Sequence, residues 1–521
     1  MSPQEYNNKL KLMIDDLKAM STSLGLSNTG DEYKIISELF TYKFLNDKLV
    51  HDFENRRNKE ETFEEFVDFA DDETPKMKKQ HLIENLYQKQ NDEKFHKIFD
   101  KAFEEINELN KDIYTIETTS GQKKPLFEKL STYIRDEDKE LQLAKRAINI
   151  LQKYDLDSIY NGGFDFFSSI FEYLIEDYNK DSGKYAEYFT PLFAGNIMSE
   201  ILYNDEEDVS NVKVYDPAAG SGTLLLSMAN KIGINKCQVY SQDISQKSTQ
   251  FLRINLILNN LVHSLHNVIE GNTLTTPEHL DGDNLMKFDY IVSNPPFKMD
   301  YSNMISTLES DRFDRFFAGL PNIPNKKKSG MAIYTSFLQH IIASLSEKGK
   351  AAVVIPTGFT TISYNMETEI RKFLVEKNWL TGVLHMPPNI FATTNTSVSV
   401  LFIDKTKNDD KLFFMDASNF GTKTKFDDGQ RTILSDEEKN IIMNYFKNRI
   451  EKKEFSVLVD KDDVASNNYY LQAGQYVELK PVEYDFDIDE RLKELEDKLY
   501  KSLKENEELS NKIIGTFFKK K

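Results

Sequence analysis

Apolar residues recur at helical spacing through the first part of the chain. An early group repeats every three or four positions: Ile35, Ile36, Leu39, Phe40, Phe44 and Leu45. The same period returns from Leu141 to Leu151 and from Phe164 to Tyr178. The stretch from His51 to Lys94 is crowded with charge, and we expect a solvated helix pair or a mobile loop there. This pattern predicts a helical N-terminal domain over residues 1–165.

From about residue 209 onward, short apolar runs typical of β-strands alternate with helical segments. Six runs stand out: Val212 to Tyr215, Gln238 to Ser241, Phe288 to Val292, Ala351 to Ile355, Thr381 to His385 and Thr396 to Ile403. Nearly continuous apolar strands separated by helices predict a mostly parallel sheet covered on both faces, within a domain over residues 166–430. The last run alternates more and follows a loop, so we expect an antiparallel edge strand there.

The chain becomes polar after Asp404 and ends in a helical pattern. In a C-terminal region over residues 431–521, apolar residues approximate a heptad repeat: Ile488, Leu492, Leu495, Leu499, Leu509 and Ile513. Such a helix either packs on its own chain or docks on a partner subunit. Its place at the end of the chain, and its high charge outside the apolar stripe, favour docking.

Composition limits the compartment and the chemistry. No stretch of about 18 apolar residues occurs, and Met1 to Glu5 lacks the layout of a signal peptide. Cys237 is the only cysteine, which excludes an intrachain disulfide and a cysteine-based zinc site. The eight histidines show no His-Glu-x-x-His spacing, so no metal is predicted. Together these features indicate a reducing cytoplasm.

The 521-residue chain is long enough for two or three domains and carries a formal net charge of −19. That charge opposes DNA phosphates, so either a partner supplies much of any DNA contact or the acidity only aids solubility. Cations do occur locally, at Lys326-Lys327-Lys328, Arg312 and Arg315. They could contact phosphates, although a solvated loop is the favoured explanation.

A glycine turn follows the first predicted strand. It reads Asp216-Pro217-Ala218-Ala219-Gly220-Ser221-Gly222 and leads into a predicted helix. Gly220 and Gly222 let the backbone approach a ligand closely, at the strand edge where doubly wound folds bind ligands. The spacing is not Gly-x-Gly-x-x-Gly, and no Gly-Lys-Ser/Thr follows, so pyrophosphate binding is not indicated. An acid at the position of Asp216 suits a ligand that carries an ammonium or sulfonium charge.

Polar residues also follow the next two strands. Asp243 ends the second strand, where a carboxylate can accept hydrogen bonds from ribose hydroxyls. Asn272 lies near a third strand end, where it could meet an adenine edge. A plain tight turn would explain the glycines alone, but with Asp243 behind them the sequence favours a nucleoside-containing cofactor.

The strand from Phe288 to Val292 runs into Asn294-Pro295-Pro296-Phe297. The prolines fix a rigid extended turn, which places Asn294 at the carboxyl edge of the sheet beside the glycine turn. The Asn294 side-chain oxygen and the Pro295 carbonyl can each accept one hydrogen of an exocyclic amino group. That grip favours a more tetrahedral nitrogen aimed at a methyl donor. Phe297 offers a face on which an extruded base can stack. A merely structural Pro-Pro turn is disfavoured by the neighbouring motifs.

These residues resemble the N6-adenine DNA methyltransferase family, specifically the modification (M) subunit of type I restriction-modification systems. The resemblance covers nearly the whole chain: Asp216 to Leu225 is similar to the cofactor turn, and Asn294 to Phe297 to the catalytic tetrapeptide. Upstream, Gly183 to Leu192 resembles the segment that closes over the methionine end of the cofactor. Downstream, Ser336 to His340 and Pro387 to Phe391 also resemble family blocks.

The resemblance implies a seven-stranded, mostly parallel S-adenosylmethionine-dependent methyltransferase sheet with a helical N-terminal domain and a C-terminal helical tail. It implies that two such subunits join one specificity (S) subunit on DNA, and that a restriction (R) subunit completes the complex. The cofactor-binding residues would be Glu187, Tyr188, Phe189, Thr190, Pro191, Leu192, Asp216, Ala219, Gly220, Ser221, Gly222, Asp243 and Asn272. The chain departs from the family at Ala219, Leu192 and Asn272, where a cysteine, a basic residue and an aspartate are common.

Other functions remain alternatives at this point. Methylation of cytosine N4 uses the same amino-group chemistry, and Asn294 with Phe297 favours adenine only moderately. Cytosine C5 methylation needs a Pro-Cys nucleophile, and Cys237 follows Lys236 instead. Protein glutamine methyltransferases can share Asn-Pro-Pro but are typically shorter and lack the Tyr188 to Pro191 block. A non-catalytic, cofactor-binding scaffold is disfavoured by the intact tetrapeptide.

Overall fold

A computed structural model describes residues 3–26, 31–71, 74–118, 121, 123–134, 136–156, 190–205, 209–363, 365–391, 397–426, 429–476 and 487–517. The chain divides into two compact units, Met1–Val477 and Glu478–Lys521. Within the described ranges, no helix combines the length and the apolar character that a membrane crossing requires.

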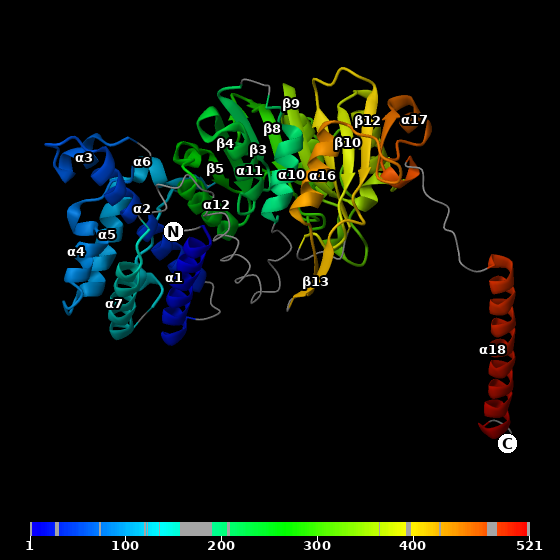
Figure 1. Cartoon of the computed structure of the whole chain (residues 1–521), viewed down its shortest axis with the longest axis horizontal. Coiled ribbons are helices and arrows are strands. Elements are labelled where there is room, and N and C mark those ends of the chain that lie inside the picture. Colours follow the sequence, from blue (N-terminus) through cyan, green and yellow to red (C-terminus); the bar gives the residue numbers. More distant parts are fainter. Residues whose placement is uncertain are drawn as a thin grey trace. The chain divides into compact units, whose positions relative to one another are not determined.

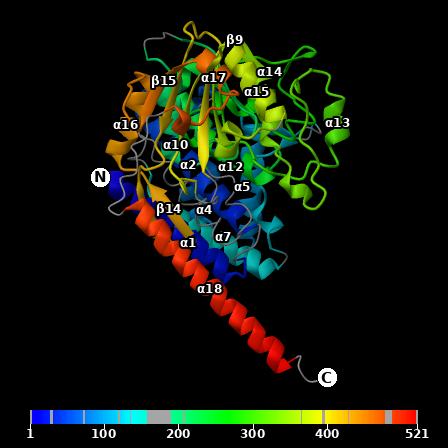
Figure 2. The same cartoon turned by 90° about the vertical axis from the view of Figure 1, so that its right-hand side faces the viewer.

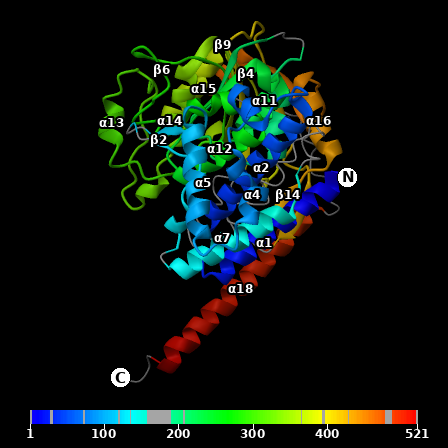
Figure 3. The same ribbon diagram turned by 90° about the vertical axis from the view of Figure 1, so that its left-hand side faces the viewer.

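The N-terminal part is helical, as expected, and packs around aromatic side chains. Tyr42, Phe103 and Phe127 lie at its centre, with the rings of Phe103 and Phe127 stacked 4.6 Å apart. The elements are α1 (Pro3–Ser23), α2 (Glu32–Arg56), α3 (Phe63–Phe69), η1 (Lys79–His81), α4 (Ile83–Gln88), α5 (Phe95–Leu109), α6 (Lys111–Tyr114), η2 (Leu130–Thr132) and α7 (Glu137–Lys153). Figures 1 and 3 show these helices gathered beside one edge of the sheet.

The charged stretch from 51 to 94 forms short helices that are not simply solvated. Thr62 caps α3 by a reciprocal pair of hydrogen bonds with Glu65, which fixes where the helix starts. Phe63 and Phe66 are buried and meet the ring of Phe53 edge-on. The charges therefore occupy the outer side of helices whose inner side joins the core.

Among the described residues, eleven strands form one sheet in the order β15-β12-β10-β11-β9-β8-β3-β4-β5-β1-β2. The strands are β1 (Ile116–Thr118), β2 (Lys123–Lys124), β3 (Val212–Asp216), β4 (Cys237–Asp243), β5 (Val268–Glu270), β8 (Phe288–Ser293), β9 (Leu345–Pro356), β10 (Leu380–His385), β11 (Val398–Asp404), β12 (Lys411–Asp416) and β15 (Ser456–Asp460). The small antiparallel pairs are β6 (Leu280–Asp281) with β7 (Asn284–Leu285), and β13 (Thr422–Phe426) with β14 (Gly429–Ile433).

The mostly parallel sheet is confirmed, but two details were wrong. The sheet has eleven strands rather than seven, because β1 and β2 extend one edge and β12 and β15 extend the other. The strand predicted near Thr396 is antiparallel, as expected, yet it is not at the edge. This strand, β11, lies between β9 and β10 and pairs antiparallel with both. Neighbours on both sides explain why nearly all its residues are buried.

Helices cover both faces of the sheet. On one face lie α10 (Leu192–Leu202), α11 (Thr223–Ile232), α12 (Gln246–Leu258) and α16 (Asp436–Lys447), and on the other α14 (Tyr334–Ser344), α15 (Asn365–Glu376) and α17 (Lys461–Ser466). Figure 2 shows α16 and α14 on opposite sides of the strands. Successive residues of β3 alternate between the layers: Val214 joins the first core and Tyr215 the second.

Shorter elements complete the first unit. They are η4 (Ile234–Lys236), η5 (Val262–Asn267), α13 (Ile305–Glu309), η6 (Lys328–Gly330), η7 (Thr357–Thr360) and η8 (Ala473–Gln475). The second unit contains one described helix, α18 (Ile488–Phe517), where the sequence predicted one. The expected apolar stripe is at least half exposed at each of Leu492, Leu495, Leu499, Leu509 and Ile513. What covers this stripe stays a prediction.

Candidate active site

The predicted site residues converge because their strands are neighbours. β8, β3, β4 and β5 are adjacent and parallel, so the residues that follow them meet at one edge of the sheet. Asp216 ends β3, Asp243 ends β4, Asn272 follows β5 and Asn294 follows β8. The structure therefore brings these four predicted residues to the same edge of the sheet.

The glycine turn is held by the carboxylate of Asp243. Its Oδ2 accepts a hydrogen bond from the Gly220 N–H at 2.9 Å, and its Oδ1 accepts one from the Ser245 N–H at 2.8 Å. Gly222 precedes α11 with φ +88°, a left-handed conformation that favours glycine. A Cβ at this position would lie 2.1 Å from Leu252 Cδ1, so the turn also has no room for a side chain.

Asp216 joins the glycine turn to the turn at Asn294-Pro295-Pro296-Phe297, here called the catalytic turn after its predicted role. It is buried, and its Oδ1 accepts hydrogen bonds from the Ser293 hydroxyl at 2.7 Å and from the Ala218 N–H at 3.0 Å. Burial raises the pKa of Asp216 to about 7, although both hydrogen bonds lower it. Burial also raises the pKa of Asp243. The edge of the sheet therefore holds two desolvated carboxyl groups, a setting that favours a cationic ligand.

An open pocket lies over this edge. Of the predicted residues, its lining includes Gly220, Ser221, Asp243, Asn272, Asn294 and Pro296. A smaller hollow adjoins it and is lined by Thr190, Asp216, Ala219, Ser221 and Asn294, among others. Ser221 and Asn294 border both spaces. Asn294 thus lies where a ligand that occupies one hollow would meet a group that enters from the other.

Asn294 is oriented by a residue from a distant segment. Its Nδ2 donates a hydrogen bond to Thr190 Oγ1 at 3.0 Å, and Thr190 is buried. Because the amide nitrogen makes this bond, Oδ1 is directed elsewhere and keeps its capacity to accept. Pro191 and Leu192 begin α10 immediately afterwards, and the Pro191 carbonyl accepts the Ala194 N–H. Glu187, Tyr188 and Phe189 lie outside the described residues.

Two predicted residues make contacts within the chain that the sequence did not predict. The Asn272 Oδ1 accepts the Leu274 and Thr275 N–H groups, so the side chain caps its own turn while it borders the pocket. Phe297 is half-buried, with its ring edge-on to Tyr334 at a centroid distance of 6.4 Å. Pro295 is buried.

Several lining residues were missed by sequence reasoning. They are Ile244, Lys247, Phe251, Met299, Tyr301 and Phe337. Ile244 has only a weak sequence signal, as an apolar residue directly after a strand-end acid; in the structure it is 54% exposed and lines the pocket. Lys247 has none, since a lysine in a helix ordinarily faces solvent. Here burial lowers the pKa of Lys247, and its ammonium lies over the Tyr33 ring at 4.8 Å.

The cations after the catalytic turn differ in exposure. Lys326, Lys327 and Lys328 are exposed, and Arg312 is exposed with its guanidinium over the Phe313 ring. Arg315 is only 2% exposed and forms an ion pair with Asp311. Both expectations for Arg315 are therefore wrong: its side chain is neither solvated nor free to contact phosphate, because its guanidinium is buried and paired inside the chain.

Among the described residues, no group of three or more His, Cys, Asp or Glu side chains could hold a metal ion.

The model of the N-6 DNA methylase family matches residues 163–485, more than half of the chain. The chain belongs to the N-6 DNA methylase family. Both turns of the pocket lie inside the matched range, so the family assignment covers the whole candidate site.

Curated relatives extend over most of the chain. A type I restriction enzyme methylase subunit, MpnII, from Mycoplasma pneumoniae is 27% identical over 485 residues, 86% of this chain and 85% of the relative. The MjaIX methylase subunit of Methanocaldococcus jannaschii is 29% identical over 367 residues, 67% of this chain and 62% of the relative. The expected resemblance to type I methylase subunits is thereby confirmed.

A solved structure shows the same fold. The methyltransferase subunit of a type I restriction-modification system from Streptococcus thermophilus matches with a TM-score of 0.71 at 21% identity. The match covers 92% of this chain and 100% of that one. This likeness confirms the predicted methyltransferase fold. The assignment as an N6-adenine DNA methyltransferase is confirmed by the family match and the curated relatives.

Proposed function

We propose that this chain methylates the N6 amino group of adenine in double-stranded DNA, with S-adenosylmethionine as the methyl donor. We further propose that it acts as the modification subunit of a type I complex, with a second copy of itself, one specificity subunit and the restriction subunit. In that complex it would protect host DNA from cleavage. The observation that carries the proposal is the Asn294 amide, held by Thr190 at the junction of two hollows.

The residues of the pocket fit S-adenosylmethionine, which when bound supplies an electrophilic methyl group. Asp243 offers a carboxylate at the position suited to ribose hydroxyls, and Ile244 exposes an apolar face beside it. The left-handed Gly222 leaves the turn without a side chain. The smaller hollow, next to Asp216 and Thr190, suits the charged methionine end. Asp216 and Asp243 would both interact favourably with a cation.

Asn294 and Pro295 would hold the target amine. The Oδ1 of Asn294 would accept one amino hydrogen and the Pro295 carbonyl the other, which weakens delocalisation of the nitrogen lone pair into the ring. Thr190 would keep the amide from rotating, so the acceptor is already aimed before the base arrives. Phe297, fixed edge-on against Tyr334, would offer its face to the extruded base.

The acidic charge and the terminal helix support a partner. A chain of net charge −19 gains little from bulk attraction to DNA, so a second polypeptide would supply sequence recognition. The exposed stripe of α18 offers that partner an apolar seam. The relatives named as type I methylase subunits make a specificity subunit the expected occupant.

The test is tritium transfer from labelled cofactor to DNA by the assembled complex. Asn294→Ala should abolish incorporation, whereas Asn408→Ala should retain it, because Asn408 is exposed in the turn after β11 at the opposite edge of the sheet. Mass spectrometry of digested DNA should find N6-methyladenine. Equal incorporation by wild type and Asn294→Ala would refute the assigned role, and N4-methylcytosine would instead assign the cytosine reaction.

A further inference from the structure

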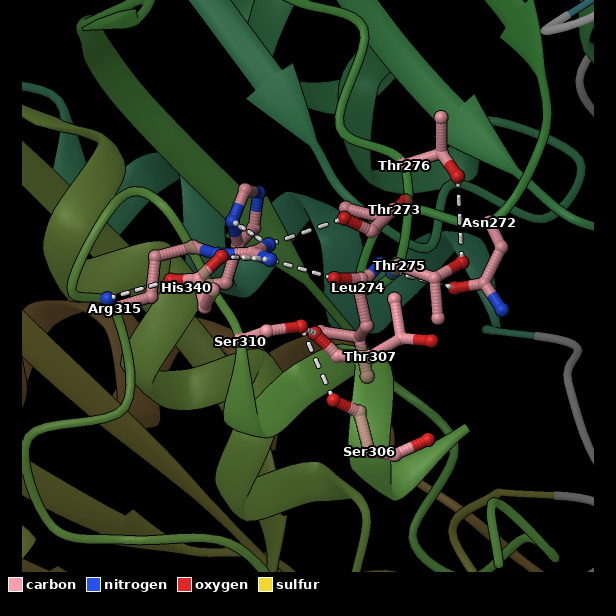
Figure 4. Close-up of polar contacts among 11 residues, drawn as sticks. Asn272, Thr273, Leu274, Thr275, Thr276, Ser306, Thr307, Ser310, Arg315 and His340 are labelled. Carbon is pink, nitrogen blue, oxygen red and sulfur yellow. Dashed lines mark hydrogen bonds and ion pairs between the residues drawn. The ribbon is translucent and has the colours of Figure 1, made fainter. Parts of the chain in front are cut away.

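Arg315 is a buried cation, and each of its three guanidinium nitrogens makes at least one hydrogen bond. Its guanidinium donates to the carbonyls of Thr273, at 3.2 Å, and Leu274, at 2.6 Å. On another side it pairs with Asp311, with Nη2 and Nε at 2.7 and 3.0 Å from one carboxylate oxygen. Figure 4 shows the guanidinium beside His340 and directed at these carbonyls. A buried charge this fully paired is costly to replace by another residue.

His340 completes the network and its tautomer follows from its partners. Nη1 of Arg315 lies 3.2 Å from His340 Nδ1, and a guanidinium can only donate, so Nδ1 must be the acceptor. The proton then resides on Nε2, which lies 3.1 Å from the Tyr215 hydroxyl. Burial, and then the charge of Arg315, lower the pKa of His340 well below its usual range. The imidazole is therefore neutral and links Arg315 to strand β3.

The carbonyls that Arg315 grips belong to one wall of the pocket. Asn272 and Thr273 line the pocket, and the Thr273 hydroxyl donates to the Pro217 carbonyl at 2.6 Å. The segment is thus tied on its pocket side to the glycine turn and on its inner side to Arg315. Asn272 also caps the Leu274 N–H, so a shift of Leu274 would move the pocket-facing amide.

We propose that Arg315 is a positioning residue for cofactor binding: it fixes the Asn272–Leu274 wall of the pocket through two main-chain carbonyls. The inference rests on the proposed function. Only arginine supplies this geometry, because its planar fork serves two carbonyls, a carboxylate and an imidazole at once, whereas lysine places three donors at a single point. Because the wall contains neither Asn294 nor Pro295, its displacement weakens binding in the ground state and the transition state alike.

Arg315→Lys and Arg315→Met should each weaken binding of S-adenosylmethionine to the full-length chain tenfold or more, measured by isothermal titration calorimetry. In the assembled complex, the KM for the cofactor should rise while kcat at saturating cofactor stays within about twofold, the pattern of lost uniform binding. Arg312→Met is the matched control. Arg312 lies in the same loop, is exposed and touches only the adjoining Phe313 ring among the described contacts, so cofactor affinity should not change.

Thermal melts of each variant set the titration temperature well below unfolding. If Arg315→Lys remains folded and binds cofactor as tightly as wild type, the positioning role is wrong while the proposed function stands. If kcat falls and the cofactor affinity does not, Arg315 acts on the reaction and not on this wall. If the wild-type chain neither binds cofactor nor methylates DNA in its complex, the proposed function itself fails.

Discussion

Thr190→Val isolates the hydrogen bond that orients Asn294. Valine keeps the shape of the buried threonine but removes the Oγ1 that accepts the Asn294 Nδ2–H at 3.0 Å. A neutral hydrogen bond contributes about 1 kcal/mol net. Because about 1.4 kcal/mol corresponds to a tenfold change in rate, loss of this bond should lower kcat roughly fivefold. If the half-buried amide is left without a partner, the free-energy cost of the substitution would be larger, up to about 3 kcal/mol.

The assay is single-turnover methylation by the assembled complex at saturating DNA and cofactor. Saturation matters because Thr190 also borders the smaller hollow, and a direct cofactor contact would appear in the cofactor affinity rather than in the rate of the chemical step. Thr190→Ser keeps the hydroxyl and should recover most of the wild-type rate. A Thr190→Val rate equal to wild type would show that Asn294 needs no external orientation, and the reasoning from this bond would be wrong.

Three further changes test the pocket. Gly222→Ala should destabilise the protein by more than the roughly 1–3 kcal/mol of a strained left-handed residue, because its Cβ would also clash with Leu252. The control is Gly282→Ala, at φ +60° with open space around it, which should cost only the backbone strain. Urea melts measure both changes in unfolding free energy. Phe297→Ala should bind cofactor normally by equilibrium dialysis yet methylate far more slowly, and a collapse of binding would contradict the stacking role. Asp216 holds its proton up to about pH 7 when folded, against about 3.9 unfolded, so stability falls as pH rises between those values. Asp216→Asn keeps the Oδ1 acceptor but does not titrate. The Tm of this variant minus the Tm of wild type should therefore increase from pH 5 to pH 8, and a difference that does not change with pH would exclude this titration.

The strands that carry the site were predictable because their patterns are local. Phe288 to Val292 differs by one residue from the observed β8, and Val212 to Tyr215 by one from β3. The added outer strands were not predicted. β12 contains only four consecutive apolar residues inside a polar region, and its burial depends on pairing with β10, which precedes it by more than 20 residues. Such pairing is not visible in a local pattern.

Side-chain partnerships were the least predictable part of the site. The segment around Arg315 has the composition of a solvated loop, and only the fold brings His340 and the Thr273 and Leu274 carbonyls against it. Thr190 was expected as a cofactor contact, while its bond to Asn294 joins residues 104 positions apart. Residue types at strand ends indicate which chemistry is present, whereas the contacts that orient those groups arise from tertiary structure.

Three internal links together explain how one sheet edge becomes a precise reaction site. Ser293 ties the catalytic turn to Asp216 of the glycine turn, Thr190 orients Asn294, and Arg315 fixes the Asn272–Leu274 wall of the pocket. Each link is buried or half-buried, so water competes little for its donors and acceptors. Small displacements of positioned groups lower the reaction rate steeply. A site held by core contacts therefore tolerates substitutions only at positions outside those contacts. This favours the proposal that a separate polypeptide, rather than variation of this edge, recognises the DNA sequence.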